Sequence, residues 1–354
     1  MNGHPERAAT PPVRKLLIPP ASWPPTLVVV IDTEEEFDWS APFDPAATAV
    51  TNIALQPLAQ DIFDRHGVVP TYAVDYPVAS TPAGADVLRR FAEEGRCEIG
   101  AHLHPWVTPP PEGPVDVWHS YPGNLPAALE RRKLTALTDA IIAGFGIRPV
   151  VYKAGRYGIG NATPSILRDL NYAVDVSVVP HTDFSTDGGP DFRDAPADPF
   201  LIADRLTELP LSVHFAGRLA TWGPSLFSHL SSTAGLRMRL PGIFSRLGLL
   251  TRYRLTPEGS SLADLINQTR SALAAGTRLF MLTYHSSSLL PGATQYVRSE
   301  VDRRAFLAAL EGYLRFFLAE CGGRTDTVRA VAASLASGPE SAAGRGPFRC
   351  TMHG

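Results

Sequence analysis

The chain has 354 residues, of which 44% are hydrophobic and 19% charged, and its formal net charge is −3 at pH 7. This composition is typical of a soluble globular protein with a large core. The balance of charges is not basic, which argues against nucleic acid as a partner. No apolar run approaches the about 20 residues that a membrane-spanning helix needs.

The cysteines and the N-terminal segment indicate a compartment. Residues 1–25 are rich in proline and lack the continuous apolar stretch of a signal peptide. Cys97, Cys321 and Cys350 are far apart and form no C-x-x-C pair, so neither a thiolate zinc site nor a disulfide framework is indicated. Both observations predict a cytoplasmic protein.

Short apolar runs rich in Val, Ile and aromatic residues predict buried strands. In chain order they are residues 26–32, 68–74, 97–104, 149–153, 173–179, 207–213 and 277–285. Helical patterns lie between most of them or follow the last one, at residues 56–66, 84–94, 125–145, 163–170, 262–275 and 301–320.

Strand and helix therefore alternate about seven times, which predicts an α/β fold with parallel strands and right-handed crossovers. Either an open doubly wound sheet or a barrel has this order. No G-x-G-x-x-G follows the first strand, which argues against a dinucleotide-binding sheet. Chemically active residues at many strand ends favour a barrel-like sheet.

Residues 218–256 interrupt the alternation with a segment that is apolar and basic in turn. It is typical of a helical insertion packed over one end of a barrel, although such segments also bind membrane surfaces or partners. We therefore predict a single domain over residues 26–335 that carries this insertion. Residues 1–25 and 336–354 are expected to be a flexible arm and a flexible tail.

The segment EIGAHLHPW, residues 98–106, holds two histidines two positions apart. Side chains alternate between the faces of a strand, so His102 and His104 point the same way and can chelate one metal ion. Pro105 ends the strand and places both at its carboxyl end, where such folds have their active sites. Two hydrogen-bonded histidines at a strand terminus are the alternative.

The segment VVVIDTEEEFDW, residues 28–39, runs from a hydrophobic strand straight into acidic residues. Charge at the end of a buried strand is costly unless it is paired or metal-bound. One carboxylate from Asp32 or Glu34 would complete a site of two histidines and one acid. The other would serve as general base. A solvated acidic loop is the alternative, and it suits Glu35, Glu36 and Asp38 better than Asp32.

Two further strand ends carry candidate groups. In VVYKAGRYGIGN, residues 150–161, glycines permit a tight turn whose backbone amides can stabilise an oxyanion. Lys153 or Arg156 is placed to pair with the base carboxylate, and a plain strand-to-helix loop is the alternative. His285 closes the last apolar strand and is a candidate general acid. A serine nucleophile at 286–288 is the rival, but no G-x-S-x-G elbow is present.

Weaker candidates lie in the middle of the chain. Asp175 sits inside a predicted strand, where burial would demand a partner. His181 and Asp183 are candidates for lining a substrate cleft, but turn chemistry alone accounts for such residues.

Taken in order, these segments resemble the polysaccharide deacetylase family, the carbohydrate esterases related to nodulation-factor and chitin deacetylases, over roughly residues 26–320. The family motif T-F-D-D-G is similar to I-D-T-E at 31–34 here. Its E-I-G-x and H-[ST]-x-x-H are similar to E-I-G-A followed by H-L-H at 98–104. R-x-P-Y is similar to K-A-G-R-Y at 153–157, and the final strand ends L-T-Y-H at 282–285.

The resemblance implies a distorted (β/α) barrel of about seven parallel strands and a divalent metal, usually zinc. It implies Asp32 as general base and Glu34 as the acidic metal ligand, beside His102 and His104. His285 is implied as general acid. With D-T-E in place of D-D, the base and the acidic ligand remain open to exchange.

The resemblance further implies that the backbone near Tyr157 forms the oxyanion hole and that Lys153 or Arg156 holds the base. The implied reaction removes an N-acetyl group from an amino sugar or glycan, which makes the chain a hydrolase of non-peptide carbon–nitrogen bonds. Without a signal peptide, we expect a cytoplasmic sugar, a lipid-linked precursor or a nucleotide sugar as substrate. An O-acetyl esterase, another amide hydrolase, or a non-catalytic carbohydrate-binding protein on the same barrel are the alternatives.

Overall fold

A computed structural model describes residues 9–337 of the chain. Residues 1–8 of the predicted flexible arm and 338–354 of the predicted flexible tail lie outside this range. Within residues 9–25, β1 (Lys15–Leu16) pairs with the sheet, with Lys15 opposite Leu201.

Ten of the strands form one sheet, and the other two form a separate antiparallel pair. The strands after β1 are β2 (Thr26–Thr33), β3 (Thr71–Val74), β4 (Glu98–Leu103), β5 (Val151–Ala154), β6 (Val174–Asp175), β7 (Phe200–Ala203), β8 (Leu206–Glu208), β9 (Val213–Ala216), β10 (Thr251–Arg254), β11 (Leu279–His285) and β12 (Arg324–Thr325).

The sheet order is β1-β7-β8-β6-β5-β4-β3-β2-β11, with β12 also paired to β2. From β8 to β11 every pairing along this path is parallel, which confirms the prediction of about seven parallel strands. Helix α11 contacts both β2 and β6, although three strands separate these two in the sheet. The sheet is therefore curled into a half-barrel, the distorted (β/α) barrel that the sequence predicts.

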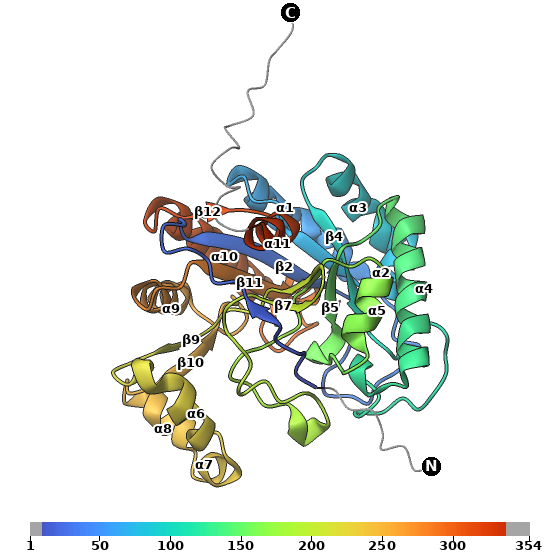
Figure 1. Cartoon of the computed structure of the whole chain (residues 1–354). Helices are drawn as coiled ribbons and strands as arrows, with labels where there is room; N and C mark the ends of the chain where they lie inside the picture. The colour runs from blue at the N-terminus through green and yellow to red at the C-terminus, as the bar shows by residue number, and fades with distance from the viewer. Residues whose placement is uncertain (1–8, 338–354) are drawn as a thin grey trace, which may run out of the picture.

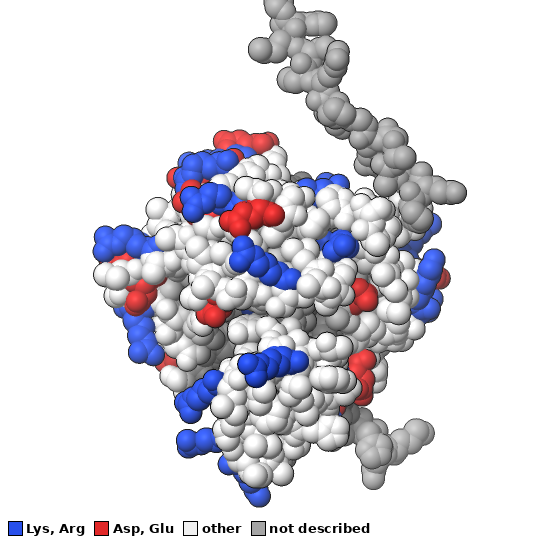
Figure 2. All heavy atoms as spheres, turned by 90° about the vertical axis from the view of Figure 1, so that its left-hand side faces the viewer, with Lys and Arg blue, Asp and Glu red and all other residues white. Residues whose placement is uncertain are grey.

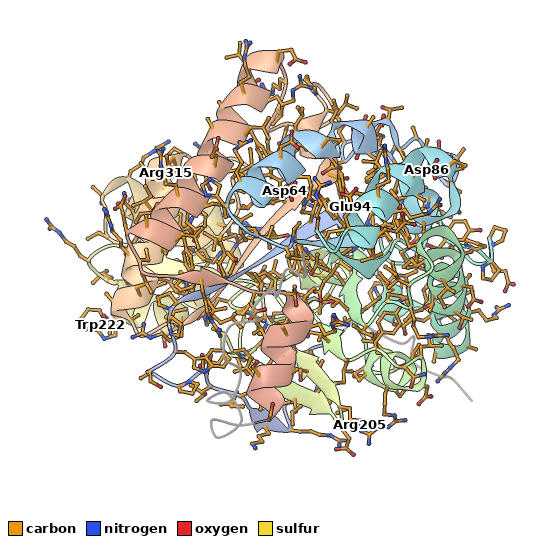
Figure 3. All side chains as sticks on the ribbon, turned by 90° about the horizontal axis from the view of Figure 1, so that it is seen from above. Asp64, Asp86, Glu94, Arg205, Trp222 and Arg315 are labelled. Carbon is orange, nitrogen blue, oxygen red and sulfur yellow. The ribbon has the colours of Figure 1, made fainter. Side chains whose placement is uncertain are left out.

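Helices connect the strands and cover the sheet (Figure 1). They are α1 (Gln56–Arg65), α2 (Tyr76–Ser80), α3 (Pro82–Glu93), α4 (Ala127–Phe145), α5 (Thr163–Asp169), α6 (Gly223–Leu230), α7 (Thr233–Arg237), α8 (Leu240–Arg246), α9 (Leu262–Ala274), α10 (Glu300–Ala319) and α11 (Val328–Ala336). Every residue of the apolar strand β2 is buried, because it lies between β3 and β11 in a sheet that helices cover. Seen from above (Figure 3), Asp86 and Trp222 lie on the outer rim of the molecule, away from the sheet.

Two of the strands predicted from the sequence differ in the structure. The predicted strand 173–179 has ladder pairing only at Val174–Asp175. The predicted strand 207–213 is divided between β8, in the large sheet, and β9, which leaves it to pair with β10. Leu209-Pro210-Leu211 lies between them, and proline donates no hydrogen bond to a ladder.

The insertion forms a lobe of three short helices, α6 to α8, that projects from the barrel at the lower left of Figure 1. It is not helical throughout, because Thr251–Arg254 returns as strand β10 antiparallel to β9. Figure 2 shows the lobe as a largely uncharged surface with arginines around it. None of the described helices is long and apolar enough to cross a membrane.

Candidate metal centre and active site

The carboxyl ends of β2, β4, β5 and β11 bring the candidate residues together. In the parallel ladders His285 lies opposite Asp32, and His102 lies opposite Lys153. Parallel strands end at the same edge of a sheet, so residues far apart in the chain meet there. His104 follows directly after β4.

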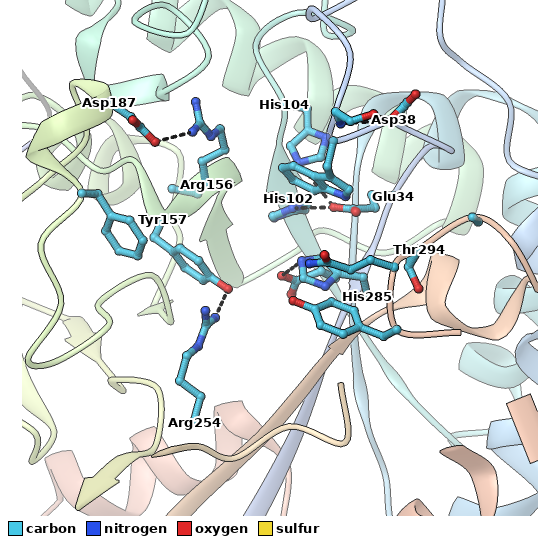
Figure 4. Close-up of a pocket in the computed structure, with 18 of the residues that line it drawn as sticks. Glu34, Asp38, His102, His104, Arg156, Tyr157, Asp187, Arg254, His285 and Thr294 are labelled. Carbon is cyan, nitrogen blue, oxygen red and sulfur yellow. Dashed lines mark hydrogen bonds and ion pairs between the residues drawn. The ribbon is translucent and has the colours of Figure 1, made fainter. Parts of the chain in front are cut away.

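Glu34, His102 and His104 form a cluster whose ligand atoms lie within 4.8 Å of one another (Figure 4). Glu34 Oε2 is 3.4 Å from His102 Nε2 and 3.5 Å from His104 Nε2. All three side chains are buried, and Glu34 Oε2 and His104 Nε2 make no hydrogen bond. Buried polar atoms without partners are costly, and a divalent cation would satisfy them. The donor set of two imidazoles and one carboxylate fits zinc or a similar ion.

Both histidine rings are oriented by hydrogen bonds at Nδ1, the ring nitrogen that does not face Glu34. Nδ1 of His102 is 3.1 Å from the backbone oxygen of Lys153, and Nδ1 of His104 is 2.8 Å from Oε2 of Glu35. Each Nδ1–H therefore donates to an oxygen, and the lone pair of each Nε2 is left toward Glu34. Burial lowers the pKa of His104, which keeps that imidazole neutral and able to ligate.

The alternative of a solvated acidic loop is wrong for Glu35. Glu35 is fully buried and accepts a hydrogen bond of 2.8 Å from Trp106 Nε1 while it holds His104. Its own amide donates to Asp75 Oδ2 at 2.7 Å. Burial raises the pKa of Glu35 to about 7 and that of Asp75 well above its usual value. Asp75 follows an apolar strand directly, as Asp32 does, and that signal was available in the sequence.

Asp32 is buried against the ammonium group of Lys153. Lys153 also donates to Thr283 Oγ1 at 3.1 Å. Burial alone would raise the pKa of Asp32, but Lys153, His102 and His285 outweigh it and lower the pKa to about 2. Of the two cations that the sequence offers for the base, the structure places Lys153 here.

Arg156 lies elsewhere in the pocket. Its Nη1 donates to Ser120 Oγ at 2.6 Å, and its guanidinium stacks over the Tyr121 ring at 4.2 Å. Its other terminal nitrogen is 3.5 Å from Asp187 (Figure 4). Arg156 therefore shapes the cavity wall and does not contact Asp32.

His285 faces Asp32 from the last strand, with Nε2 3.6 Å from Asp32 Oδ2. Its Nδ1 is 3.0 Å from Oε2 of Glu258, a residue that the sequence analysis missed. Burial opposes the charged form of His285, but Glu258 and Glu34 outweigh it and raise its pKa well above the usual value. Glu258 stands in a turn-like segment after the insertion, and nothing in its local pattern distinguishes it from a surface acid.

The turn after β5 is strained. Arg156 and Tyr157 both have positive φ, 53° and 62°, a conformation that costs non-glycine residues about 1–3 kcal/mol each and is typical of functional sites. Gly155 is required beside them, because a Cβ there would lie 2.4 Å from Leu103 O and 2.6 Å from His104 Cδ2. The turn is thus packed against the metal-ligand strand.

These groups open into a cavity of about 740 Å³. Aromatic side chains line it beside the acids and histidines, namely Trp39, Tyr121, Tyr157, Phe184 and Tyr296. His181 and Asp183, which the sequence offered as cleft residues, are not in its wall. Phe184 and Asp187 of the same loop are. Asp175, also buried, hydrogen-bonds to Ser177 at 2.5 Å instead of reaching the cavity.

Comparison with known proteins rests on structure alone. No protein family model and no curated protein matches the sequence. Among solved structures, one described as a polysaccharide deacetylase from Mycobacterium smegmatis superposes with a TM-score of 0.53 and 19% identity, over 98% of this chain and 100% of that one. A peptidoglycan deacetylase from Bacillus subtilis gives a TM-score of 0.42 and 12% identity, over 90% and 94%. A CE4 family pseudoenzyme from Bacillus anthracis gives 0.42 and 10%, over 87% and 66%.

Fold and site together define a distorted (β/α) barrel with a buried cluster of two histidines and one acid at the carboxyl ends of its strands. The fold is that of the Mycobacterium smegmatis protein, along the whole length of both chains. The chain therefore shares the fold of a solved structure described as a polysaccharide deacetylase, which is the fold that the family resemblance implies.

Proposed function

We propose that the chain is a metal-dependent hydrolase that removes an N-acetyl group from an amino sugar or glycan. The observation that carries this proposal is that the side chains of Glu34, His102 and His104 converge. Asp32, paired with Lys153, lies on one side of them, and His285, paired with Glu258, lies on the other. A divalent ion held there would polarise the acetyl carbonyl and lower the pKa of a water molecule.

Asp32 is proposed as the general base and Glu34 as the acidic ligand. This assignment is supported by their contacts, since Glu34 Oε2 faces both imidazoles whereas Asp32 contacts Lys153 and His285. The Lys153 ammonium keeps Asp32 ionised, so its oxygen can accept a proton from the attacking water. The Tyr157 amide as oxyanion donor remains a prediction from the family resemblance.

His285 is proposed as the general acid. Its imidazole is charged near neutral pH because Glu258 stabilises the protonated form. Loss of an amine from a tetrahedral intermediate requires a proton on nitrogen, and His285 Nε2 lies on the cavity side to deliver it. An ester with a good leaving group has no such requirement, which separates N-deacetylation from O-deacetylation mechanistically.

An amino sugar suits the cavity walls. The apolar faces of Trp39 and Tyr296, which are both exposed, offer surfaces for a sugar ring, and polar groups near the strand ends fix its orientation. The acetyl group would point to Glu34, at the floor of the cavity.

The test is metal content and acetate release measured on the same preparations. The purified protein is expected to bind about one zinc-like ion per chain and to release acetate from N-acetylated sugars. His102→Ala is expected to abolish both, while His229→Ala, at an exposed histidine of the insertion, is expected to change neither. Acetate release at the full rate by metal-free protein would contradict the proposal. Faster release from O-acetyl than from N-acetyl sugars would favour an esterase, and turnover of neither would favour a binding protein.

We also propose that the lobe of α6 to α8 contacts an anionic membrane surface. Residues 209–257 contain no Asp or Glu, and arginines stand among exposed apolar side chains. The proposal is supported by Trp222, Met238 and Leu247, which are 63%, 64% and 64% exposed. Apolar residues that enter the interface beside arginines that meet lipid phosphates are typical of interfacial helices.

Flotation with vesicles tests the lobe. The full chain is expected to bind vesicles that contain phosphatidylglycerol, less so at high salt, and not to bind pure phosphatidylcholine. The double change Trp222→Ser and Leu247→Ser is expected to abolish binding, whereas Val301→Ser, at an exposed valine of α10, is a matched control. No binding to either vesicle, or dimerisation through the lobe in solution, would contradict the proposal.

A further inference from the structure

One arginine of the cavity, Arg254, forms no close ion pair within the described residues, although the charges of Glu258 and Asp32 act on it from farther away. The guanidinium of Arg254, at the end of β10, donates to the Tyr157 hydroxyl (Figure 4), and within the described residues this is its one hydrogen bond. No carboxylate of the described chain lies within 4.0 Å of it, and its Nε is buried without a partner. A positive charge inside a protein is costly unless something pairs with it.

The neighbouring carboxylates are already engaged. Glu258, the nearest acid in sequence, accepts hydrogen bonds from His285 and from Ser288 at 2.5 Å. Asp32 is held by Lys153. Arg254 is therefore a guanidinium of the cavity that these carboxylates do not pair with.

A second arginine adds positive charge on the same face. Arg252 is two residues before Arg254 on β10, so their side chains project on one side of the strand. Arg252 is fixed by bonds to the backbone oxygen of His181 and to Thr182 Oγ1, at 2.9 and 2.6 Å. Burial and the charge of Arg254 lower its pKa to about 10. Two like charges held close on one strand face make an anion favourable there.

The position links these charges to the hydrolytic centre. Arg254 and His285 line both the active-site cavity and an adjoining cavity of about 480 Å³, which Arg252 also lines. Hydroxyl groups of Ser245, Thr251 and Thr256 line the second cavity as well. Two acids also line this cavity: Glu258, which is engaged by His285 and Ser288, and Asp264, which accepts a hydrogen bond from Ser261. Planar guanidinium groups beside hydroxyls are the donors that phosphate oxygens prefer.

We propose that Arg254, supported by Arg252, is an anion subsite that binds a phosphate group of the substrate, so that the substrate is a phosphorylated or diphosphate-linked N-acetylated amino sugar. The proposal rests on the proposed function for the acetyl half of that substrate. The phosphate half can be tested without any turnover.

Calorimetric titration of the full chain with inorganic pyrophosphate is the first test. Wild type is expected to show saturable binding, and Arg254→Gln to weaken it about tenfold to a hundredfold, the effect of losing a charge-assisted hydrogen bond. Arg246→Gln makes the same change of charge at an exposed arginine of α8 and is expected to bind as wild type does. His102→Ala separates this subsite from the metal site and should keep pyrophosphate binding.

Three outcomes would overturn the subsite. They are no binding by wild type, equal binding by wild type and Arg254→Gln, or binding lost in His102→Ala but kept in Arg254→Gln, which would assign the anion to the metal. Melting curves show whether Arg254→Gln folds. If it does not, Arg254→Lys keeps the charge without the bidentate fork and is expected to lose part of the affinity. Full affinity in that variant would also contradict the proposal.

Kinetics then identify the source of the anion. Arg254→Gln is expected to raise KM for N-acetylglucosamine 1-phosphate about tenfold or more, and by a larger factor than KM for N-acetylglucosamine. An equal effect on a carboxylate-bearing acetylated amino sugar would overturn the assignment to phosphate. Arg254-dependent pyrophosphate binding without hydrolysis of any acetylated sugar would refute the proposed function and leave the subsite standing.

Discussion

In the proposed reaction Glu258 keeps His285 protonated for the leaving amine, and Glu258→Gln tests this role. Glutamine has the same size and keeps an oxygen for the His285 amide, which now donates to Glu258 Oε1 at 3.0 Å. The substitution removes the negative charge that lies 3.0 Å from Nδ1 of His285. The charged form of His285 then loses its largest stabilising partner, and burial drives the imidazole toward its neutral form.

The size of the effect follows from that one contact. A charge-assisted hydrogen bond contributes about 1.5–3 kcal/mol, so kcat for an N-acetyl substrate at neutral pH should fall about tenfold to a hundredfold. The sign of the pH effect is fixed as well. The pKa of His285 is raised in the wild type, so the acid form persists to higher pH there. In Glu258→Gln the alkaline limb of the rate profile should move to lower pH.

The assay compares two substrates across the pH range. Acetate release from an N-acetylated sugar requires the acid, whereas hydrolysis of p-nitrophenyl acetate does not, because nitrophenolate leaves without a proton. Glu258→Gln should therefore lose activity on the amide and retain most of its activity on the ester. Glu300→Gln, at an exposed acid of α10, is the matched control. An equal loss on both substrates, or an unmoved alkaline limb, would refute the role of Glu258.

Three further predictions concern stability. Lys153→Met leaves Asp32 buried without its cation and should lower the free energy of unfolding by about 3–5 kcal/mol in urea titrations; a loss below 1 kcal/mol would contradict the pair. Burial raises the pKa of Asp175 to about 7 and that of Glu208 well above its usual value. The folded state thus holds more protons than the unfolded state, and stability should fall as pH rises from about 4 through 7, less steeply in Glu208→Gln. Removal of divalent metal with a chelator should lower the melting temperature and added zinc should restore it, because an ion that binds only the folded state stabilises it.

The sequence predicted the barrel because its signals are local. Apolar runs such as TLVVVID and LFMLTYH mark buried parallel strands without reference to any partner. Their ends carry Asp32 and His285, and parallel strands bring those ends together. The position of these catalytic candidates therefore follows from chain order and strand direction, which the sequence does contain.

What failed depends on partners that lie far away in the chain. Glu35 resembles its neighbours Glu36 and Asp38, and only the approach of Trp106 and His104 makes it a buried acid. Glu258 becomes part of the site only through its contact with His285 of β11. Its position after a long insertion gives no sign of that contact. Local composition does not encode such contacts, because the same residue types serve on the surface.

The altered motifs have a common physical explanation in the strand period of two. In H-L-H the two histidines share a face because one residue separates them, and Leu103 turns into the core. His104 therefore comes at the strand terminus, where Glu35 holds it from behind. In D-T-E the same spacing keeps Asp32 within β2, where its carboxylate pairs with the Lys153 side chain, while Glu34, just past the end of β2, reaches both imidazoles. The two spacings together bring the three ligand atoms within 4.8 Å of one another, and a change in one spacing without the other would separate them.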